Sequence, residues 1–187
     1  LEDLARLGVN RVSFGFQTTD PKILRITARH HDNEALTGIV PRAKNLGIKV
    51  NVDIMYGGFL GETLEMDKSS FEYALGLGTD WTTGYQVCVQ EGTAEATRWL
   101  KQRTQYPGTK EMLLARAMLH EMARARGYSY LGGDYFASKA SPLVFQSNRW
   151  SGRTTVTALG SGTYSYIIGG AGEEGNLLWW APFTIEE

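Results

Sequence analysis

Cysteine is nearly absent from this chain of 187 residues, in which Cys88 is the single example. One cysteine excludes an intrachain disulfide framework and any cysteine-ligated metal or iron–sulfur site held by this chain alone. Long apolar runs are also lacking, since none approaches the roughly 18 residues of a membrane-spanning helix. The formal net charge of −1 gives no basic surface for nucleic acid or an anionic membrane. We therefore expect neither partner and, without a signal-peptide pattern, a cytoplasmic location.

Hydrophobic residues make up 42% of the sequence, which is enough for one sizeable core. The opening stretch LEDLARLG reads as the last two turns of a helix, with Gly8 placed just after the helix end. Leu1 is not an initiator methionine. Together these features predict that the chain is a piece of a longer protein.

Strand and helix patterns alternate along the first two thirds of the chain. A proline inside one predicted helix, Pro41, is expected to kink or split it. Strand, helix, strand in this order is typical of a parallel α/β sheet. The predicted strands are 11–17, 48–58 and 81–89. A first helix is predicted to begin at Asp20-Pro21, and three further helices are predicted at 32–46, 62–77 and 109–127.

Polar residues lie at or near the carboxyl ends of the predicted strands. Gln17 ends the first strand, and Asp53 lies shortly before the end of the second. In parallel sheets these ends form one edge, where ligands bind. Two interpretations stay open from the pattern alone: these side chains converge on a ligand, or they satisfy the backbone groups of nearby loops.

Several motifs, in order, resemble those of the HemN-like radical S-adenosylmethionine (SAM) enzymes, the family of oxygen-independent coproporphyrinogen III oxidase. The resemblance covers nearly the whole chain, and the ordered set is more specific than any single motif. The motifs are GVNRVSFGFQTTD, LRITARHHDNE, VNVDIMYGGFLGETLEM, YQVCVQEGT, GYSYLGGDYFAS and LGSGTYSYIIGGAGEEGN.

The resemblance implies an α/β fold: the second half of a partial (β/α)6 radical SAM barrel of the TIM type, followed by a carboxyl-terminal α+β domain. We expect residues 1–107 to form the barrel half and residues 108–187 the second domain. The family's 4Fe–4S cluster is held by a C-x3-C-x2-C motif in the first half of the barrel, so its ligands would lie outside this chain. The full-length protein would be a radical SAM oxidoreductase with a flavodoxin or ferredoxin as electron donor, and the isolated chain would be inactive.

The family's SAM-binding residues can be matched to Gln17 in GFQ, Arg29 in TAR and Asp53 in VDIMYG. A sulfonium ligand with ammonium, carboxylate and ribose hydroxyl groups suits an amide, a cation and a carboxylate. Ala28 stands where relatives often have glycine. No catalytic residue and no metal ligand is assigned within the chain.

The resemblance implies a tetrapyrrole as substrate. The preferred function is that of a coproporphyrinogen III oxidase, which converts propionates to the vinyl groups of protoporphyrinogen IX by oxidative decarboxylation. Radical haem-ring opening or methylation is an alternative, and a haem chaperone that binds without oxidase chemistry is another. The stretch YGGFLGET departs from the usual YGLPGQT, so a different loop is expected there.

Other motifs favour structural roles. GAGEEG at 170–175 fits a dinucleotide loop formally, but its two glutamates would repel a pyrophosphate, so a turn is expected. His30 and His31 are adjacent and have no third metal ligand nearby in the sequence, since His120 lies on a distant helix. Cys88 is expected to be a small buried residue within a strand. The pair Trp179-Trp180 is expected to pack against the domain rather than stack on a macrocycle.

Overall fold

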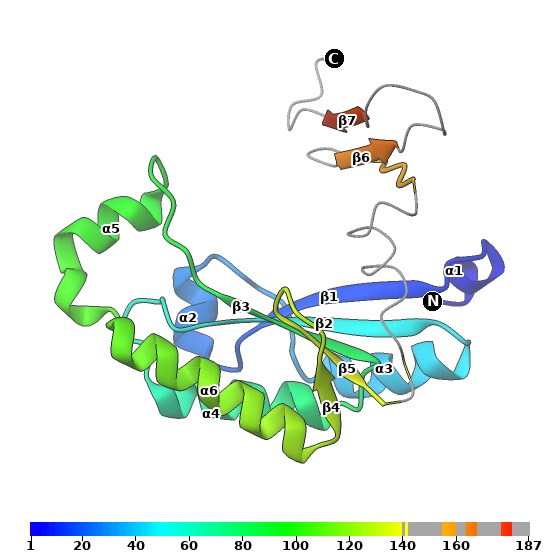
Figure 1. The fold of residues 1–187 in the computed structure, drawn as a ribbon, viewed down its shortest axis with the longest axis horizontal. Helices are drawn as coiled ribbons and strands as arrows, with labels where there is room; N and C mark the ends of the chain where they lie inside the picture. The colour runs from blue at the N-terminus through cyan, green and yellow to red at the C-terminus, as the bar shows by residue number, and fades with distance from the viewer. Residues whose placement is uncertain (140, 142–154, 160–163, 168–176, 181–187) are drawn as a thin grey trace. The chain divides into compact units, whose positions relative to one another are not determined.

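The computed structural model describes residues 1–139, 141, 155–159, 164–167 and 177–180. The chain forms two compact units, residues 1–142 and 143–187, of which the first contains the α/β sheet (Figure 1). Its helices are α1 (Glu2–Arg6), α2 (Pro21–Ile26), α3 (Ala35–Asn45), α4 (Leu64–Gly76), α5 (Ala94–Gln102), the 3-10 helix η1 (Arg103–Gln105) and α6 (Thr109–Ala125). Its strands are β1 (Arg11–Gln17), β2 (Lys49–Tyr56), β3 (Trp81–Gln86), β4 (Tyr128–Tyr130) and β5 (Tyr135–Ser138), and the second unit contains β6 (Tyr164–Ile167) and β7 (Leu177–Trp180).

The five strands of the first unit form one mixed sheet in the order β1-β2-β3-β5-β4. Strands β1, β2 and β3 are parallel neighbours, as the alternation of strands and helices predicted. Strand β5 runs antiparallel to β3, and β4 runs antiparallel to β5. The α/β class is confirmed, and α6, β4 and β5 belong to the same compact unit as the parallel strands. The domain boundary expected between 107 and 108 stays a prediction.

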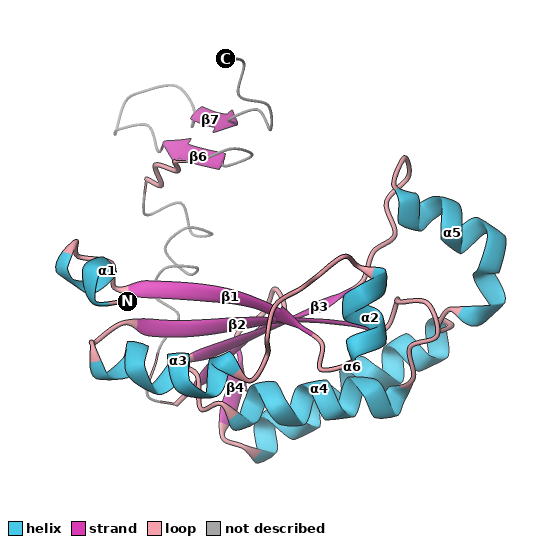
Figure 2. Cartoon of the chain, turned by 180° about the vertical axis from the view of Figure 1, so that it is seen from behind, coloured by secondary structure: helices cyan, strands magenta, loops and turns pink. Residues whose placement is uncertain are grey.

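One face of the sheet is the hydrophobic core. Helices α3, α4 and α6 lie along this face (Figure 2). On β2, the middle one of the three parallel strands, Val50, Val52 and Ile54 are fully buried, and each points to the helices because alternate strand residues share a face. Phe71 of α4 packs edge to face against Tyr56 at the end of β2. Hydrophobic burial on this side therefore holds the strands in place and leaves the other face free for polar side chains.

Helix α3 is one continuous helix that contains Pro41, so of the two expected effects, a kink or a split, the structure contradicts the split. Proline removes one backbone hydrogen bond. The burial of Leu36, Val40 and Ala43 against the sheet stabilises the segment in spite of that loss. The helix also begins later than predicted, with Glu34 at its N-cap, because the Asp32 carboxylate accepts a hydrogen bond from the Glu34 backbone N–H at 2.8 Å.

Helix α6 packs closely on the sheet at two glycines. A Cβ atom on Gly84 of β3 would lie 2.3 Å from Leu119 Cδ2, so only glycine allows this approach. Near the start of the helix, a Cβ atom on Gly57 would lie 3.4 Å from Met112 Cα, and Gly57 has a φ of +71°. The most buried residues of α6 are Ala115, Leu119 and Ala123, spaced by four as expected for one helix face.

The helix start at Asp20 and the helix end at Gly8 are as the sequence predicted. Asp20 caps α2 by accepting hydrogen bonds from the backbone N–H groups of Lys22 and Ile23. Gly8, with φ +84°, follows the end of α1 in the left-handed conformation that glycine adopts without strain. In the part of the chain that the structure describes, we find no helix with the length and apolarity needed to cross a membrane.

Candidate functional site

The face of the sheet opposite the helices carries small and polar residues. On β1, Ser13 and Gly15 are exposed on this face. On β2 the corresponding residues are Asn51 and Asp53, and Gly15 pairs directly with Asp53 in the parallel register. Asp53 in turn pairs with Thr83 of β3. The polar face therefore crosses all three parallel strands.

Gln17 and Arg29 converge over Gly15. A Cβ atom at Gly15 would lie 2.7 Å from Gln17 Nε2 and 3.7 Å from Arg29 Nη1, so the missing side chain leaves room for both groups. Gln17 is 8% exposed. Among the described residues, its Oε1 atom is buried and has no hydrogen-bond partner. A buried unpaired acceptor is costly, so this oxygen is available to a donor other than the described residues, such as a ligand.

Backbone geometry turns Gln17 toward this position. The β1–β2 register shifts between Gly15 and Gln17, and Gln17 has a φ of +68°. Such bulges redirect a side chain. Ala28, next to Arg29, also has a positive φ of +53°. This conformation strains a residue with a Cβ atom, so the glycine that the family resemblance implies at this position would adopt it more easily.

Hydrogen bonds fix the Asp53 carboxylate. Asn51 Nδ2 donates to Asp53 Oδ1 at 2.8 Å, and Ser13 Oγ donates to Asp53 Oδ2 at 3.1 Å. Asn51 is almost fully buried, and its own Oδ1 accepts from Thr83 Oγ1 at 2.9 Å. One carboxylate oxygen therefore has a donor on its own strand and the other has a donor on β1. The half-buried carboxylate keeps acceptor capacity toward the open face.

A pair of tyrosines extends the polar face toward β5. Burial raises the pKa of Tyr85, and its hydrogen bond to Tyr135 and the charge of Asp53 raise it further. The phenol is therefore a neutral hydrogen-bonding group near the aspartate at physiological pH. Sequence reasoning did not assign Tyr85 to the site, and it also missed Ser13, Asn51 and Thr83. A sequence pattern could have found the last three, because each is a polar residue two positions before Gly15, Asp53 or Tyr85 and therefore lies on the same face of its strand.

The loop after β2 is held by two buried carboxyl groups. Glu62 Oε2 accepts hydrogen bonds from the backbone N–H groups of Gly58 and Phe59 at 2.7 and 2.9 Å. Asp67 of α4 hydrogen-bonds to Glu62 and to the Gly57 backbone. Burial, and then the charge of Glu62, raise the pKa of Asp67 to about 9. The pair therefore holds a proton at neutral pH, and it organises the loop whose sequence departs from the family pattern.

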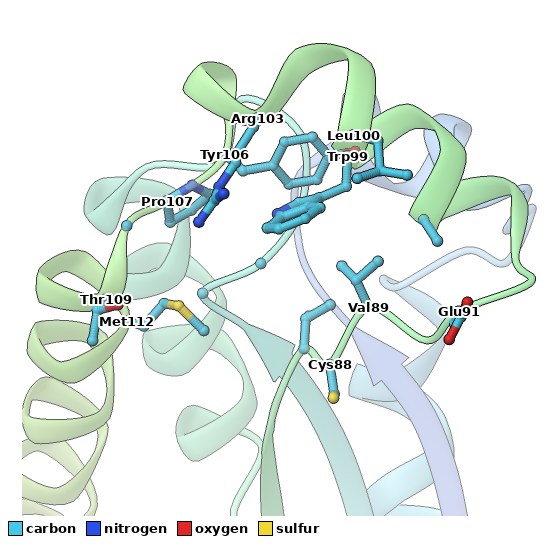
Figure 3. Close-up of a pocket in the computed structure, with 15 residues that line it drawn as sticks. Cys88, Val89, Glu91, Trp99, Leu100, Arg103, Tyr106, Pro107, Thr109 and Met112 are labelled. Atoms are coloured by element: carbon cyan, nitrogen blue, oxygen red, sulfur yellow. The ribbon is translucent and has the colours of Figure 1, made fainter.

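A cavity of 610 Å³ lies beyond the ends of β2 and β3 (Figure 3). Its walls come from the Gly57–Gly58 turn, the segment that follows β3, helix α5 and the start of α6. Cys88 contributes to this wall but is exposed and lies after the end of β3, so the expectation of a cysteine buried within a strand was wrong. Helix α5, which the sequence reasoning did not predict, forms the outer side.

The remaining candidate motifs give no metal site within the described residues. No group of three His, Cys, Asp or Glu side chains is placed to hold a metal in the ranges that the structure describes. His31 Nε2 lies 3.0 Å from the Phe16 carbonyl oxygen, and His120 packs on Tyr130 and Phe136. The GAGEEG stretch lies outside the described residues, as do the side chains of the Trp179-Trp180 pair.

Comparison with known proteins shows similarity to the radical SAM superfamily. Residues 1–74, which include Gln17, Arg29 and Asp53, match the model of the radical SAM superfamily. The heme chaperone HemW of Bacillus subtilis is 26% identical over 90% of this chain and 44% of its own length. The oxygen-independent coproporphyrinogen III oxidase of Salmonella typhimurium is 22% identical over 96% of this chain and 44% of its own length. The chain thus spans less than half the length of these two relatives.

The fold agrees with the sequence comparisons. The coproporphyrinogen III oxidase HemN of Escherichia coli superposes with a TM-score of 0.70 at 20% identity, over 88% of this chain and 40% of that protein. An archaeal Elp3 from Methanocaldococcus infernus superposes with a TM-score of 0.51 over 62% of this chain and 28% of that protein. The matching region, residues 1–74, is thus similar to the radical SAM superfamily. The sequence and the fold of the chain are similar to those of HemN-like proteins.

Proposed function

We propose that this chain forms the SAM-binding carboxyl-terminal part of a HemN-like radical enzyme that acts on a tetrapyrrole. The observation that supports the proposal is the convergence of the Gln17 amide and the Arg29 guanidinium over Gly15, beside the Asp53 carboxylate. These are the residues that the family resemblance assigned to SAM. The matching superfamily region contains all three.

The three side chains fit the polar groups of SAM. The unpaired Gln17 Oε1 accepts a hydrogen bond, the Arg29 guanidinium pairs with a carboxylate, and Asp53 pairs with an ammonium or with ribose hydroxyls. The network of Ser13 and Asn51 keeps the Asp53 carboxylate oriented before ligand binds. Such preorganisation lowers the cost of binding a charged group.

In this family, SAM and a 4Fe–4S cluster together supply a 5′-deoxyadenosyl radical, which abstracts hydrogen from a substrate. The single cysteine of this chain leaves the cluster ligands to another part of the protein. Within this proposal Gln17, Arg29 and Asp53 bind and orient SAM. A flavodoxin or ferredoxin would supply the electron.

The preferred reaction is oxidative decarboxylation of coproporphyrinogen III. Support comes from the relative that carries this activity by name and from the fold match to HemN. The heme chaperones among the relatives support a second candidate, a haem-binding protein that keeps the scaffold without this chemistry. Radical ring opening and methylation of haem remain further alternatives within the enzyme class.

The test uses the complete protein, purified and reconstituted anaerobically. With SAM and a reductant we expect formation of 5′-deoxyadenosine, and with coproporphyrinogen III we expect protoporphyrinogen IX. Haem bound tightly without turnover of either tetrapyrrole would establish the chaperone instead. Absence of both SAM binding and tetrapyrrole binding would refute the proposal.

A further inference from the structure

Helix α5 has an apolar side that the described structure leaves largely uncovered. None of its residues is buried, and Leu100 is 75% exposed. Its residues Ala96, Trp99 and Leu100 line the 610 Å³ cavity. A helix of nine residues is not stable in water by itself, so its stability comes from what it packs against. This points to an occupant of the cavity that covers the apolar side of α5.

Aromatic and aliphatic side chains form most of the cavity wall. Trp99 and Tyr106 face it from the α5 side, and Met112 faces it from α6 (Figure 3). Tyr106 is held in place by a hydrogen bond from its hydroxyl to Glu95 Oε1 at 2.5 Å. The volume lies within the range of about 300–1,000 Å³ found for small-molecule sites. A flat, largely apolar molecule matches this lining.

One cation is directed into the apolar space. The Arg103 guanidinium carbon lies 4.7 Å from the centre of the Trp99 ring, in a cation–π arrangement. Figure 3 shows the guanidinium between Pro107 and Trp99, inside the cavity. Glu91 is the one acidic side chain in the lining, and it lies at the opposite side in this view. An arginine on an aromatic ring favours a planar ligand that carries a carboxylate.

The cavity adjoins the candidate SAM site through the main chain. Gly57 and Gly58 follow β2, the strand of Asp53, and Val87 follows β3. A Cβ atom at Gly58 would lie 2.6 Å from Val87 Cβ, so the two strand ends touch here. The Gly61 backbone N–H also donates to the Gln105 carbonyl at 2.8 Å. This hydrogen bond connects the same loop to η1, the 3-10 helix that contains Arg103.

We propose that this cavity binds a propionate-bearing tetrapyrrole, with Arg103 paired to a propionate carboxylate and the macrocycle packed against Trp99. This inference rests on the proposed function for the class of ligand, and the structure supplies the position and the residues. It assigns to α5 the role of covering one side of the ring.

The test measures binding of coproporphyrin III to the complete protein, by fluorescence titration without SAM or reductant. Arg103→Gln should weaken binding roughly 10-fold or more through the lost charge-assisted pair. Trp99→Leu should weaken it about 2- to 10-fold through the lost aromatic contact. Lys101→Gln removes the same charge from α5 at a residue outside the cavity lining, and binding should not change.

Each outcome bears on a different claim. Tight binding that Arg103→Gln and Trp99→Leu leave unchanged would overturn this inference and leave the proposed function standing. Equal weakening by Lys101→Gln would also overturn it, because the effect would be general charge attraction. No binding by the unmodified protein would refute a tetrapyrrole ligand altogether, and SAM binding measured on the same sample would show whether the SAM site is intact. Since neither α5 nor η1 buries a residue, we expect all three variants to keep the circular dichroism of the unmodified protein.

Discussion

The two faces of strand β2 are built in opposite ways. On the helix side, Val50, Val52 and Ile54 are fully buried and hold the sheet by packing. On the other side, Asn51 and Asp53 form a hydrogen-bonded network with β1 and β3. Under the proposed function, residues one position apart serve stability and ligand binding separately. We therefore expect substitutions on the two faces to have separate effects, on stability or on ligand affinity, even though the positions are adjacent in sequence.

The largest effect is expected on the core face. Ile54→Ala removes a fully buried side chain, and we expect it to lower the free energy of unfolding by about 2–5 kcal/mol. Urea unfolding of the complete protein measures this loss. Ile54→Val is the matched control and should cost only about 0.5–1.5 kcal/mol. If the folded Ile54→Ala protein lost SAM affinity as well, the proposed separation of the two faces would be wrong.

On the polar face, Asp53→Ala should weaken SAM binding and leave folding nearly intact. The lost charge-assisted hydrogen bond corresponds to about 1.5–3 kcal/mol, or roughly one to two decades in affinity. Isothermal titration calorimetry under anaerobic conditions measures this change. Asn51→Ala, which removes a donor to the same carboxylate, should give a smaller loss of affinity. Unchanged affinity in folded Asp53→Ala would contradict the assignment of this residue.

The buried carboxyl pair predicts how stability varies with pH. The pKa of Asp67 rises from 3.8 to about 9 on folding, so the folded state holds a proton that the unfolded state has released. The contribution of this carboxyl group to stability should therefore be greatest at acidic pH and fall through the window from about pH 4 to about pH 9, by at most about 1.4 kcal/mol per pH unit. Asp67→Asn should flatten this fall, because the amide imitates the protonated acid. Unfolding free energies of both proteins, measured at intervals across the window, give the two slopes. An equally steep fall in Asp67→Asn would contradict the prediction.

The smallest effect concerns Gln17. Its amide is neutral, so Gln17→Ala should weaken SAM binding by about 0.5–1.5 kcal/mol, less than Asp53→Ala. Removing the unpaired buried Oε1 also relieves a cost in the unliganded protein, so stability without ligand should not fall by a matching amount. Paired calorimetry and urea unfolding on this variant test both statements. A loss of affinity larger than that of Asp53→Ala would reverse the proposed ranking.

Part of this architecture was predictable from local patterns. The alternation of residues in β1 and the Asp20-Pro21 helix start predicted the elements that the structure shows. Gln17 and Asp53 were predicted from their places near the strand ends. Their convergence depends on the parallel β1–β2 register and on the positive φ of Gln17, which are tertiary features.

Other features had no clear local signal. Helix α5 was missed because its hydrophobic residues do not join the core. Pro41 does not split α3, because packing of the helix against the sheet outweighs the intrinsic helix-breaking effect of proline. The Glu62–Asp67 pair was not predicted, because nothing in a sequence shows that two acidic residues five positions apart share a buried contact. In each case long-range packing, rather than local propensity, decides the outcome.

The two glycine contacts of α6 have a consequence for how this family can vary. Leu119 occupies the space above Gly84, and Met112 occupies the space above Gly57. A relative with alanine at the position of Gly84 would need a smaller residue than leucine at the position of Leu119. We therefore expect these positions to change in pairs among relatives. Because Met112 also lines the cavity, a paired change at Gly57 would reshape the cavity and alter which ligands fit it.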